Sequence, residues 1–438
     1  MPVKDMEAQI NLFWFRRDLR LDDNPGLFAA LTAGRPVLPV FVFDTAILGK
    51  LPDRDDARVR FIHQELMALK RDLEDAGSSL LTFYGSPLEA FEYFAHRFSP
   101  GAVYCNRDYE PYGQERDREV SAILKQQGID FFSFKDHVIF EPGEVLKDDG
   151  TPYTVFTPYS RKWKTRLTED HSRHYASANG KEAFLKTSPF SFPELSDLGF
   201  AVGREDFPSR SIDRELIWNY GQTRDFPGIA GSSRLGIHLR FGTISIRNVV
   251  EVAQKNSEVF LNELIWREFF ISILAHFPYV ETAPFRKKYG LITWRNNEEE
   301  FDRWCRGETG YPMVDAGMRE LRATGFMHNR VRMVTASFLA KHLLIDWRWG
   351  EAWFAAHLLD FELASNNGNW QWAAGCGCDA APYFRVFNPA TQQQKFDAAG
   401  SYVRKWVPEA GTVAYARPMV DHALARERAL KTYRDALE

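Results

Sequence analysis

Short apolar runs alternate with amphipathic stretches over the first 140 residues of the chain. The runs rich in β-branched and aromatic residues predict five strands: Ile10–Phe15, Val37–Phe43, Leu80–Tyr84, Ala102–Cys105 and Phe131–Phe134. Apolar positions at helical spacing predict helices over Asp55–Ala76, Pro87–Phe98 and Gln114–Gln127. Because strands and helices alternate, this part is predicted to be α/β, with a doubly wound parallel sheet.

The pattern changes in the second half of the chain. Residues Ser172–Asp225 are rich in Ser, Pro, Gly and charge, which predicts a long connector. Beyond Asn219 helical spacing recurs over Asn248–Phe277, Glu298–Arg306, Asp315–Thr324, Met327–Trp347 and Gly350–Leu359. We therefore expect an α/β domain over residues 8–140, a linker over 141–218 and an all-α domain over 219–438.

Composition excludes several classes of protein. With 438 residues, 45% of them hydrophobic, the chain can bury large cores and is not disordered. It has no apolar run long enough to span a membrane, so we expect a cytoplasmic protein. Its four cysteines include only one close pair, Cys376 and Cys378, which has no second pair of ligands beside it. We therefore expect neither a disulfide framework nor a metal site.

Charge leaves a local polyanion site open. The net charge is −4, yet residues 319–348 hold six Lys or Arg against two acids. This excess of positive charge fits contact with phosphates, and it fits a solvated helix face equally well. Ten of the 12 Trp follow residue 200, which fits core packing, a ligand with a large π surface or a site for bases.

Two helix faces carry candidate chemistry. Over Met327–Trp347 one side has Val331, Val334 and Phe338, and the opposite side has Asn329, Arg332, Met333 and Ala336. The second side mixes Met and Ala with polar residues, so we expect it to face something buried as well. A second helix aligns Glu263, Trp266, Arg267 and Phe270 at i, i+3, i+4 and i+7. This set suits a polar ligand that also stacks, although Glu263 and Arg267 could instead be an ordinary surface pair.

Signals for phosphate binding are weaker. The sequence has no P-loop motif and no G-x-G-x-x-G after its first strand. Residues Ala230–Arg234 could offer backbone N–H groups and hydroxyls to a phosphate, or could simply cap a helix.

Two runs, Asp360–Trp372 and Asp379–Pro389, give the most specific signal. With FWFRRDLRLDDNPGL at Phe13–Leu27 and VRKWVPE at Val403–Glu409, they resemble the photolyase/cryptochrome flavoprotein family over essentially the whole chain. The resemblance implies an N-terminal α/β domain, a long linker and a helical domain that binds FAD.

The resemblance also implies roles for individual residues. Asn366 is similar to the residue whose amide faces flavin N5, and Arg332 and Asp360 to an ion pair beside the isoalloxazine. Three residues resemble the tryptophan chain of flavin photoreduction: Trp370, Trp347 and Trp294. The implied FAD-binding residues are Tyr220, Ser232, Ser233, Arg234, Leu235, Gly236, Phe260, Glu263, Arg267, Phe270, Asn329, Arg332, Asp360, Glu362 and Asn366.

For the substrate, the resemblance favours cyclobutane pyrimidine dimers in UV-damaged DNA. Asn329 and Met333 stand where members that repair (6-4) photoproducts have His. Trp266 and Trp372 match the aromatic residues that receive a flipped dimer, and Glu263 matches the residue that hydrogen-bonds it. The implied phosphate contacts are Arg224, Arg330 and Arg385.

Some positions depart from the family pattern. Ser232–Ile237 replaces the usual Thr-Ser-x-Leu-Ser-Pro, and Phe260 stands where Trp is frequent. Tyr112 and Gly113 replace the Asn-Glu pair of folate-binding relatives, so the sequence does not identify a second, antenna chromophore. We expect a monomeric light-driven repair enzyme. One alternative is a cryptochrome-type photoreceptor that binds FAD without repairing DNA. Another is a flavin-dependent nucleic-acid binder without repair activity.

Overall fold

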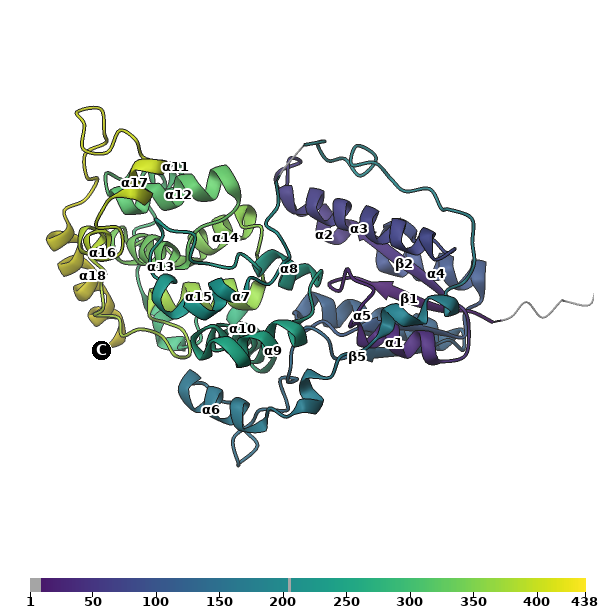
Figure 1. Ribbon diagram of the computed structural model, residues 1–438. Helices are drawn as coiled ribbons and strands as arrows, with labels where there is room; N and C mark the ends of the chain where they lie inside the picture. Colours follow the sequence, from purple (N-terminus) through teal and green to yellow (C-terminus); the bar gives the residue numbers. More distant parts are fainter. Residues whose placement is uncertain (1–8, 204–205) are drawn as a thin grey trace, which may run out of the picture. The chain divides into compact units, whose positions relative to one another are not determined.

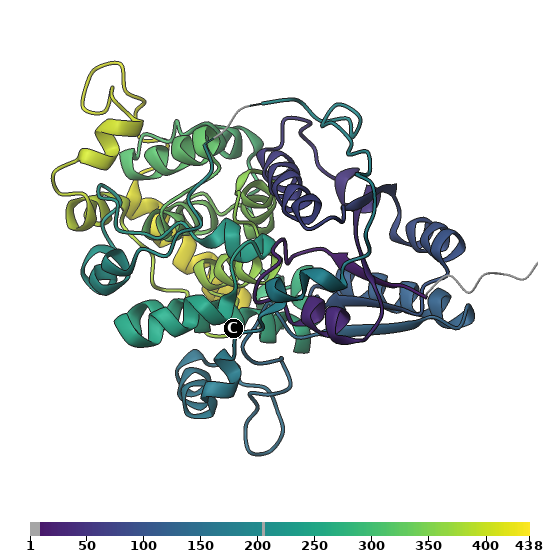
Figure 2. The same cartoon turned by 45° about the vertical axis from the view of Figure 1, so that its right-hand side comes forward.

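The computed structural model describes residues 9–203 and 206–438, which form two compact units (Figures 1 and 2). The first unit contains the chain up to Glu141 together with Leu167–Ser211 and Leu235–Val252. The second contains Pro142–Arg166, Ile212–Arg234 and Ala253–Glu438. Both units draw on the segment that was predicted to be a linker. Residue 8, where the predicted α/β domain begins, lies outside the described residues.

The first unit is built on a five-stranded parallel sheet. Its strands are β1 (Asn11–Phe15), β2 (Val37–Asp44), β3 (Leu81–Gly85), β4 (Ala102–Asn106) and β5 (Asp130–Phe134), in the order β3-β2-β1-β4-β5. Central β1 pairs Asn11 with Val37 on one side and with Ala102 on the other. The predicted strands and the doubly wound parallel sheet are confirmed.

Helices cover both faces of this sheet. Phe13 and Phe15 pack against α1 (Pro25–Thr32) and α3 (Ala57–Asp75), whereas Leu12 and Trp14 pack against α4 (Pro87–Phe98) and α5 (Pro111–Gln126). Both faces of β1 are therefore buried, which explains its unbroken apolar sequence. Helix α1 was not predicted, because its eight residues are too few to display a clear period. Asn24 caps it and Pro25 is its first residue.

The rest of the unit and most of the remaining chain are helical. The short α2 (Thr45–Leu48) and α8 (Gly236–Phe241) belong to the first unit, and α9 (Ile246–Asn256) runs from the first unit into the second. The other helices of the second unit are α6 (Phe156–Arg166), α7 (Arg214–Thr223), α10 (Glu258–His276), α11 (Glu298–Arg306), α12 (Pro312–Thr324), α13 (Asn329–Ser337), α14 (Trp347–His357), α15 (Leu363–Ala374), α16 (Pro389–Phe396), α17 (Ser401–Trp406) and α18 (His422–Leu437). All strands of the described residues lie before residue 135, so the all-α prediction for the second half is confirmed.

Two long helices of the prediction are each interrupted. The helix predicted over Asn248–Phe277 is wrong as a single element, because Ser257 is extended (φ −160°) and its hydroxyl caps α10. The helix predicted over Met327–Trp347 ends as α13 at Ser337, is followed by a π-helical turn over Phe338–His342, and is broken at Leu344, where φ is +49°. Apolar spacing continues through both interruptions, so periodicity could not reveal them.

Close approach between helices shapes the second unit. A Cβ atom on Gly368 of α15 would lie 2.1 Å from Phe270 Cδ1 of α10. One on Gly350 of α14 would lie 2.1 Å from Cη2 of Trp370. Only glycine lets these helices pack this tightly, and Phe270 and Trp370 are residues that the sequence placed at a functional site.

Candidate functional site

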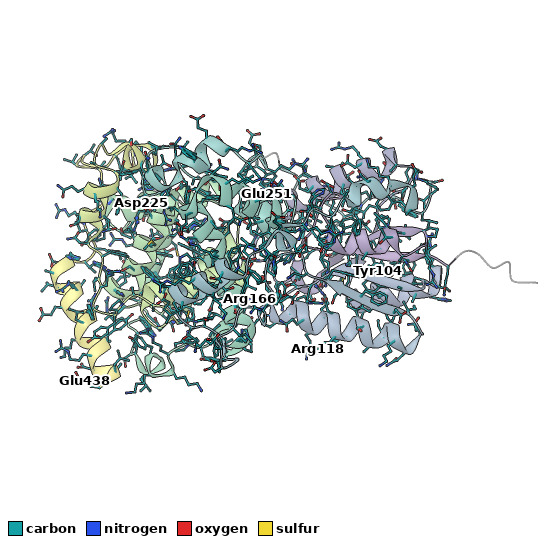
Figure 3. All side chains as sticks on the ribbon, turned by 60° about the horizontal axis from the view of Figure 1, so that its bottom comes forward. Tyr104, Arg118, Arg166, Asp225, Glu251 and Glu438 are labelled. Carbon is teal, nitrogen blue, oxygen red and sulfur yellow. The ribbon has the colours of Figure 1, made fainter. Side chains whose placement is uncertain are left out.

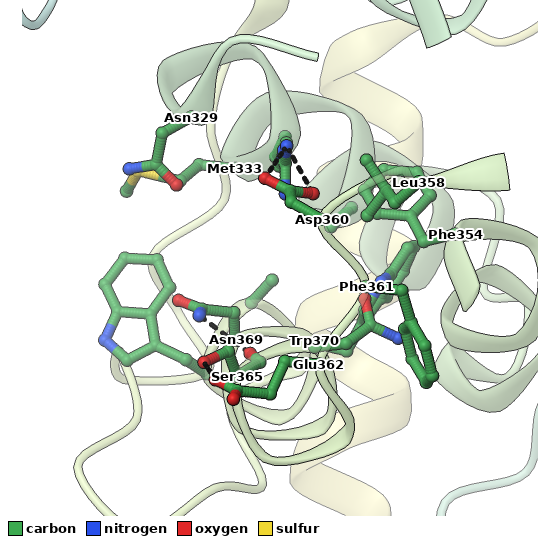
Figure 4. A pocket seen from close by; sticks show the side chains of 15 residues that line it. Asn329, Met333, Phe354, Leu358, Asp360, Phe361, Glu362, Ser365, Asn369 and Trp370 are labelled. Carbon is green, nitrogen blue, oxygen red and sulfur yellow. Dashed lines mark hydrogen bonds and ion pairs between the residues drawn. The ribbon is translucent and has the colours of Figure 1, made fainter. Parts of the chain in front are cut away.

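A pocket opens between α13, the segment before α15, and α15 itself (Figure 4). From α13 it receives Asn329, Arg332, Met333 and Ala336, the helix side that was expected to face something buried. Figure 4 shows Asn329 and Met333 across the pocket from Ser365 and Asn369. The pocket is completed by Phe354, Leu358, Asp360, Phe361, Glu362, Asn366, Trp370, Trp372 and Ala373.

Arginine–carboxylate pairs fix the pocket wall. Arg332 Nη2 donates to both carboxylate oxygens of Asp360, at 3.1 and 3.0 Å, and its Nε donates to the Met327 carbonyl at 2.7 Å. Arg267 Nη2 of α10 donates to Glu362 Oε1 at 2.9 Å. The carboxylates of Asp360 and Glu362 are thus each paired with an arginine. The predicted Arg332–Asp360 ion pair is present.

Asn366 is oriented by a residue that the sequence did not suggest. Its Nδ2 donates to the Glu351 carbonyl at 3.1 Å and to Glu351 Oε1 at 2.9 Å. With both amide hydrogens engaged, the Oδ1 atom is left to accept a hydrogen bond from a ligand. Burial raises the pKa of Glu351, and the bond from Asn366 opposes that rise. Glu351 belongs to no motif, so only the fold could reveal it.

Tryptophans form the apolar part of the site. Trp370 is buried, and its ring centroid lies 4.9 Å from Phe354 and 6.2 Å from Trp304. Its Nε1 is buried without a hydrogen-bond partner among the described residues. Trp347 is buried and Trp294 is partly buried in the same hydrophobic core. Trp304, a direct ring neighbour of Trp370, was not singled out from the sequence.

A second cluster lies along α7 and α10. Arg224 forms an ion pair with Glu263, its guanidinium lies 5.5 Å from the Tyr220 ring centroid, and Tyr220 contacts Phe260 edge-on at 5.0 Å. Burial raises the pKa of Glu263, although Arg224 opposes the rise. Glu263 and Arg267 each bind a different partner, Arg224 and Glu362, so they are not merely a surface pair.

Trp266 is stacked on a residue from a distant segment. Its ring lies 3.7 Å from that of Phe156, with an angle of 5° between the planes, and 5.4 Å from that of Phe270. The Phe156 N–H donates to Asp379 Oδ2 at 3.0 Å, which ties α6 to the segment after α15. Phe156 belongs to none of the motifs named above, and Asp379 is only the first residue of the run Asp379–Pro389. The sequence therefore did not predict this contact.

The three predicted phosphate contacts differ in their surroundings. Arg224 is paired with Glu263, and Arg330 Nη2 donates to Asp225 Oδ1 at 2.6 Å. Asp225 is labelled in Figure 3. Arg385 is exposed and has no ion-pair partner in the part of the chain that the structure describes. Two of the three arginines are therefore neutralised within the protein.

The segment suggested for phosphate binding, Ala230–Arg234, lies in the second unit, and the predicted FAD-binding run Ser232–Gly236 is divided between the two units. Ser232, Ser233 and Arg234 belong to the second unit, and Arg234 has a φ of +53° with its guanidinium 4.4 Å from the Phe326 ring centroid. Arg332 lies 5.8 Å from the same ring. Leu235 and Gly236 belong to the first unit.

Sequence profiles of known families match most of the chain. The DNA photolyase family matches residues 11–177, and the FAD binding domain of DNA photolyase matches residues 260–414. The chain is also 37% identical to the deoxyribodipyrimidine photo-lyase of Synechococcus sp., over 95% of both sequences. The chain belongs to the DNA photolyase family.

Solved photolyase-family structures share its fold. The class III photolyase of Agrobacterium tumefaciens has 34% sequence identity and a TM-score of 0.88, covering 99% of each chain. The cryptochrome of Synechocystis sp. has 26% identity and a TM-score of 0.84, covering 98% of this chain and all of that one. The resemblance read from the motifs is therefore confirmed, and so is the presence of an FAD-binding domain.

The residues of the pocket fit FAD, the cofactor of the matched FAD-binding domain. The pocket combines the free acceptor of Asn366, the paired carboxylates and the unpartnered Nε1 of Trp370 at its wall. An unpartnered buried donor is uncommon in folded proteins and fits a wall that is completed by a ligand. Among the described residues no helix is long and apolar enough to cross a membrane, and no cluster of three or more His, Cys, Asp or Glu could hold a metal.

The first unit has a cavity of its own at the carboxyl ends of β1 and β2. Trp14 lies in its wall between two guanidiniums, those of Arg16 at 4.6 Å and Arg116 at 4.9 Å, and Tyr112 donates to Asp44 Oδ2 at 2.5 Å. Tyr112 and Gly113, which replace the Asn-Glu pair of folate-binding relatives, both line this cavity. An antenna chromophore remains a prediction without an identity.

Proposed function

We propose that this protein uses blue light and bound reduced FAD to split cyclobutane pyrimidine dimers in DNA. One observation carries the proposal: a single pocket contains Asn329, Met333, Asn366 and Trp372, which come from two helices separated in sequence. Members that repair (6-4) photoproducts resemble each other in having His at the first two positions, so the polar amide and thioether favour the cyclobutane dimer.

The cofactor would be held by residues already fixed by their neighbours. Bound reduced FAD supplies the electron that light makes available to the dimer. Arg332 and Asp360 would lie beside the isoalloxazine, and Asn366 Oδ1 would accept a hydrogen bond from N5–H. Glu351 keeps the Asn366 amide in that orientation. The other proposed FAD contacts on α7 and α10 are Tyr220, Phe260, Glu263, Arg267 and Phe270.

The dimer would be bound by aromatic stacking and one carboxyl group. Trp266 and Trp372 offer indole faces, and stacking on an aromatic side chain contributes about 1 to 3 kcal/mol per base. Phe156 covers one face of Trp266, so a base can use only the other. Glu263 would offer its carboxyl group for a hydrogen bond to a dimer carbonyl.

DNA phosphates would be met by Arg224, Arg330 and Arg385. Arg385 is ready for this contact, whereas Arg224 and Arg330 must be shared with, or released from, Glu263 and Asp225. Pairing in the free protein keeps these partly buried charges neutralised until DNA arrives. We retain Trp370, Trp347 and Trp294 as the residues that carry electrons to the site from the surface.

A light–dark comparison tests the proposal. Purified protein containing FAD is incubated with duplex DNA that contains thymine dimers, under blue light or in darkness, and the remaining dimers are counted. We expect dimers to disappear only in the light. If none disappear although FAD is bound, the repair function is wrong.

The alternative function is a photoreceptor of the cryptochrome type. It is favoured by the structural similarity to the Synechocystis cryptochrome, which covers 98% of this chain with a TM-score of 0.84. Such a protein would bind FAD and respond to light, yet leave dimers intact in the same experiment.

A further inference from the structure

Lys341 is an ammonium buried in the core of the second unit. It is 1% exposed and lies in the π-helical turn that follows α13. Such turns interrupt a helix at some cost and are frequent at functional sites. Its Nζ donates to the backbone carbonyl of Arg385, at 2.7 Å.

The buried charge has no carboxylate beside it. In the part of the chain that the structure describes, Lys341 forms no ion pair. Of the nearby groups, Arg385 disfavours its charged form and the buried thiol of Cys376 favours it. Burial, and then Arg385, lowers the pKa of Lys341 to about 8. Burying an unpaired ammonium is costly, and an apolar side chain of similar length would fill the same space. Core packing therefore does not explain why the residue is lysine.

The hydrogen bond of Lys341 ends on a segment with a DNA-facing role. The chain from Gly375 to Asn388 links α15 to α16 and presents Phe384, which is 61% exposed, and Arg385. The Arg385 N–H donates to the Pro382 carbonyl at 2.9 Å, so both backbone polar groups of Arg385 are engaged. Farther back, Asp379 accepts the N–H of Phe156. The exposed segment Gly375–Asn388 is thus fixed by hydrogen bonds at Asp379 and at Arg385.

We propose that Lys341 is a positioning residue that fixes the backbone of Arg385 for contact with a DNA phosphate beside the lesion pocket. Arg224 and Arg330 are tied to carboxylates, so Arg385 is the arginine among the three whose guanidinium is free, and the placement of its backbone then decides where that charge meets the DNA. The positive charge of Lys341 beneath the segment adds to the attraction of a polyanion. This inference rests on the proposed repair function.

A double-mutant cycle between Lys341 and Arg385 tests it in the holoprotein. The variants are Lys341→Met, Arg385→Ala and the combination, and the measurement is the Kd for a dimer-containing duplex at several salt concentrations. We expect each single change to weaken binding about tenfold, as for loss of a charge-assisted contact. We expect the double variant to stay within twofold of the weaker single variant, because Lys341 acts through Arg385.

Further readouts separate positioning from general stability. Lys341→Met and Arg385→Ala should each lower the slope of log K against log salt by about 1. In Lys341→Met, the FAD content and the repair rate at saturating DNA should stay unchanged. Lys395→Met, which removes an exposed positive charge from α16, serves as the control and should change the affinity less than threefold. Lys341→Gln keeps a hydrogen-bond donor and removes the charge. Its affinity for the dimer-containing duplex should lie between those of wild type and Lys341→Met.

Several results would overturn the inference. Multiplicative losses in the double variant, or unchanged affinity in Lys341→Met, would show that Lys341 does not act through Arg385. If Lys341→Met loses FAD, the cycle is repeated with Lys341→Gln. Multiplicative losses of affinity in that cycle would likewise overturn the inference. If the wild type itself repairs no dimers, the proposed function fails, and that result is distinct from a failed cycle.

Discussion

Glu263 shows how the role of one residue depends on its partners. Burial raises the pKa of Glu263, and the ion pair with Arg224 opposes that rise. We expect Glu263→Ala to lower the quantum yield of dimer splitting about tenfold or more, because charge that develops on the dimer loses its hydrogen-bond partner. Repair is measured per photon absorbed, and FAD content is measured alongside.

Helix α10 supplies a control for this change. Glu258→Ala removes a carboxylate of the same helix that pairs with Lys164 at its surface, and it should leave repair unchanged. An unaltered quantum yield in Glu263→Ala would remove Glu263 from the mechanism.

We expect retention of FAD to depend on the ion pair between Arg332 and Asp360. Arg332→Met would leave a carboxylate at the pocket wall without its counter-charge, and loss of one partner of such a pair costs roughly 3 kcal/mol or more. We expect the Kd for FAD to rise at least about tenfold, measured by equilibrium dialysis. Arg348→Met, which disrupts an exposed pair with Asp346, is the matched control. Equal FAD affinity in the two variants would contradict the assignment.

The sequence predicts part of this site, residue by residue, and misses the rest for a physical reason. The side of α13 that carries Asn329, Arg332 and Met333 followed from helical spacing, and these three residues line the pocket. Glu351, Asp225 and Phe156 were missed, because each acts on a residue at least 15 positions away in the sequence. Such partners are brought together only by packing.

At the level of elements, α13 begins at a buried histidine that titrates. His328 Nδ1 accepts the N–H of Arg330 at 3.2 Å, while burial and the charges of Arg332 and Arg330 lower the pKa of His328 from 6.5 to about 4. The unfolded chain therefore takes up a proton below pH 6.5 that the folded protein resists until about pH 4. Stability is full above pH 6.5 and falls as the pH drops, by roughly 3 kcal/mol from this residue.

His328→Asn keeps a helix cap without the titrating group. We expect its free energy of unfolding to fall less than that of the wild type between pH 7 and 4.5, measured by urea denaturation of the holoprotein. Parallel stability curves would show that His328 does not cause the loss.

The pattern of apolar residues predicted where elements lie more reliably than where they end. All five strands were predicted within two residues of their bounds, since buried parallel strands have unbroken apolar runs. The breaks at Ser257 and at Leu344 interrupt the backbone and leave apolar spacing intact. Helix α15 carries the most specific motif of the chain, and yet its mixture of Asn, Gly and Trp concealed its helical character.

For the whole molecule, we expect electrostatics to decide the affinity for DNA. A net charge of −4 disfavours general attraction to DNA, and Arg330, a predicted phosphate contact, is paired with Asp225. Asp225→Asn should therefore tighten binding of dimer-containing DNA severalfold and steepen its salt dependence by up to about 1 in slope. The measurement is Kd against salt concentration.

Asp302→Asn is the control, because it changes the net charge by the same amount as Asp225→Asn. It removes a carboxylate from an exposed ion pair with Arg306. It should have a smaller effect than Asp225→Asn. The same gain in both variants would show that only net charge matters, and that Arg330 is not a phosphate contact.

The sequence predicted an α/β part and a helical part, and it could not predict how the chain is shared between them. Residues 142–166 and 212–234 belong to the helical unit although they precede most of it. Their assignment depends on contacts such as Phe156 with Trp266, which no local pattern encodes.

We expect light absorbed by FAD in this pocket to drive repair. The most direct test is the action spectrum of dimer loss, compared with the absorption spectrum of the bound reduced cofactor in the same sample. We predict that the two spectra coincide at wavelengths where FAD alone absorbs, and that dimers persist in darkness. Dimers that persist at every wavelength while FAD stays bound and reduced would contradict the account.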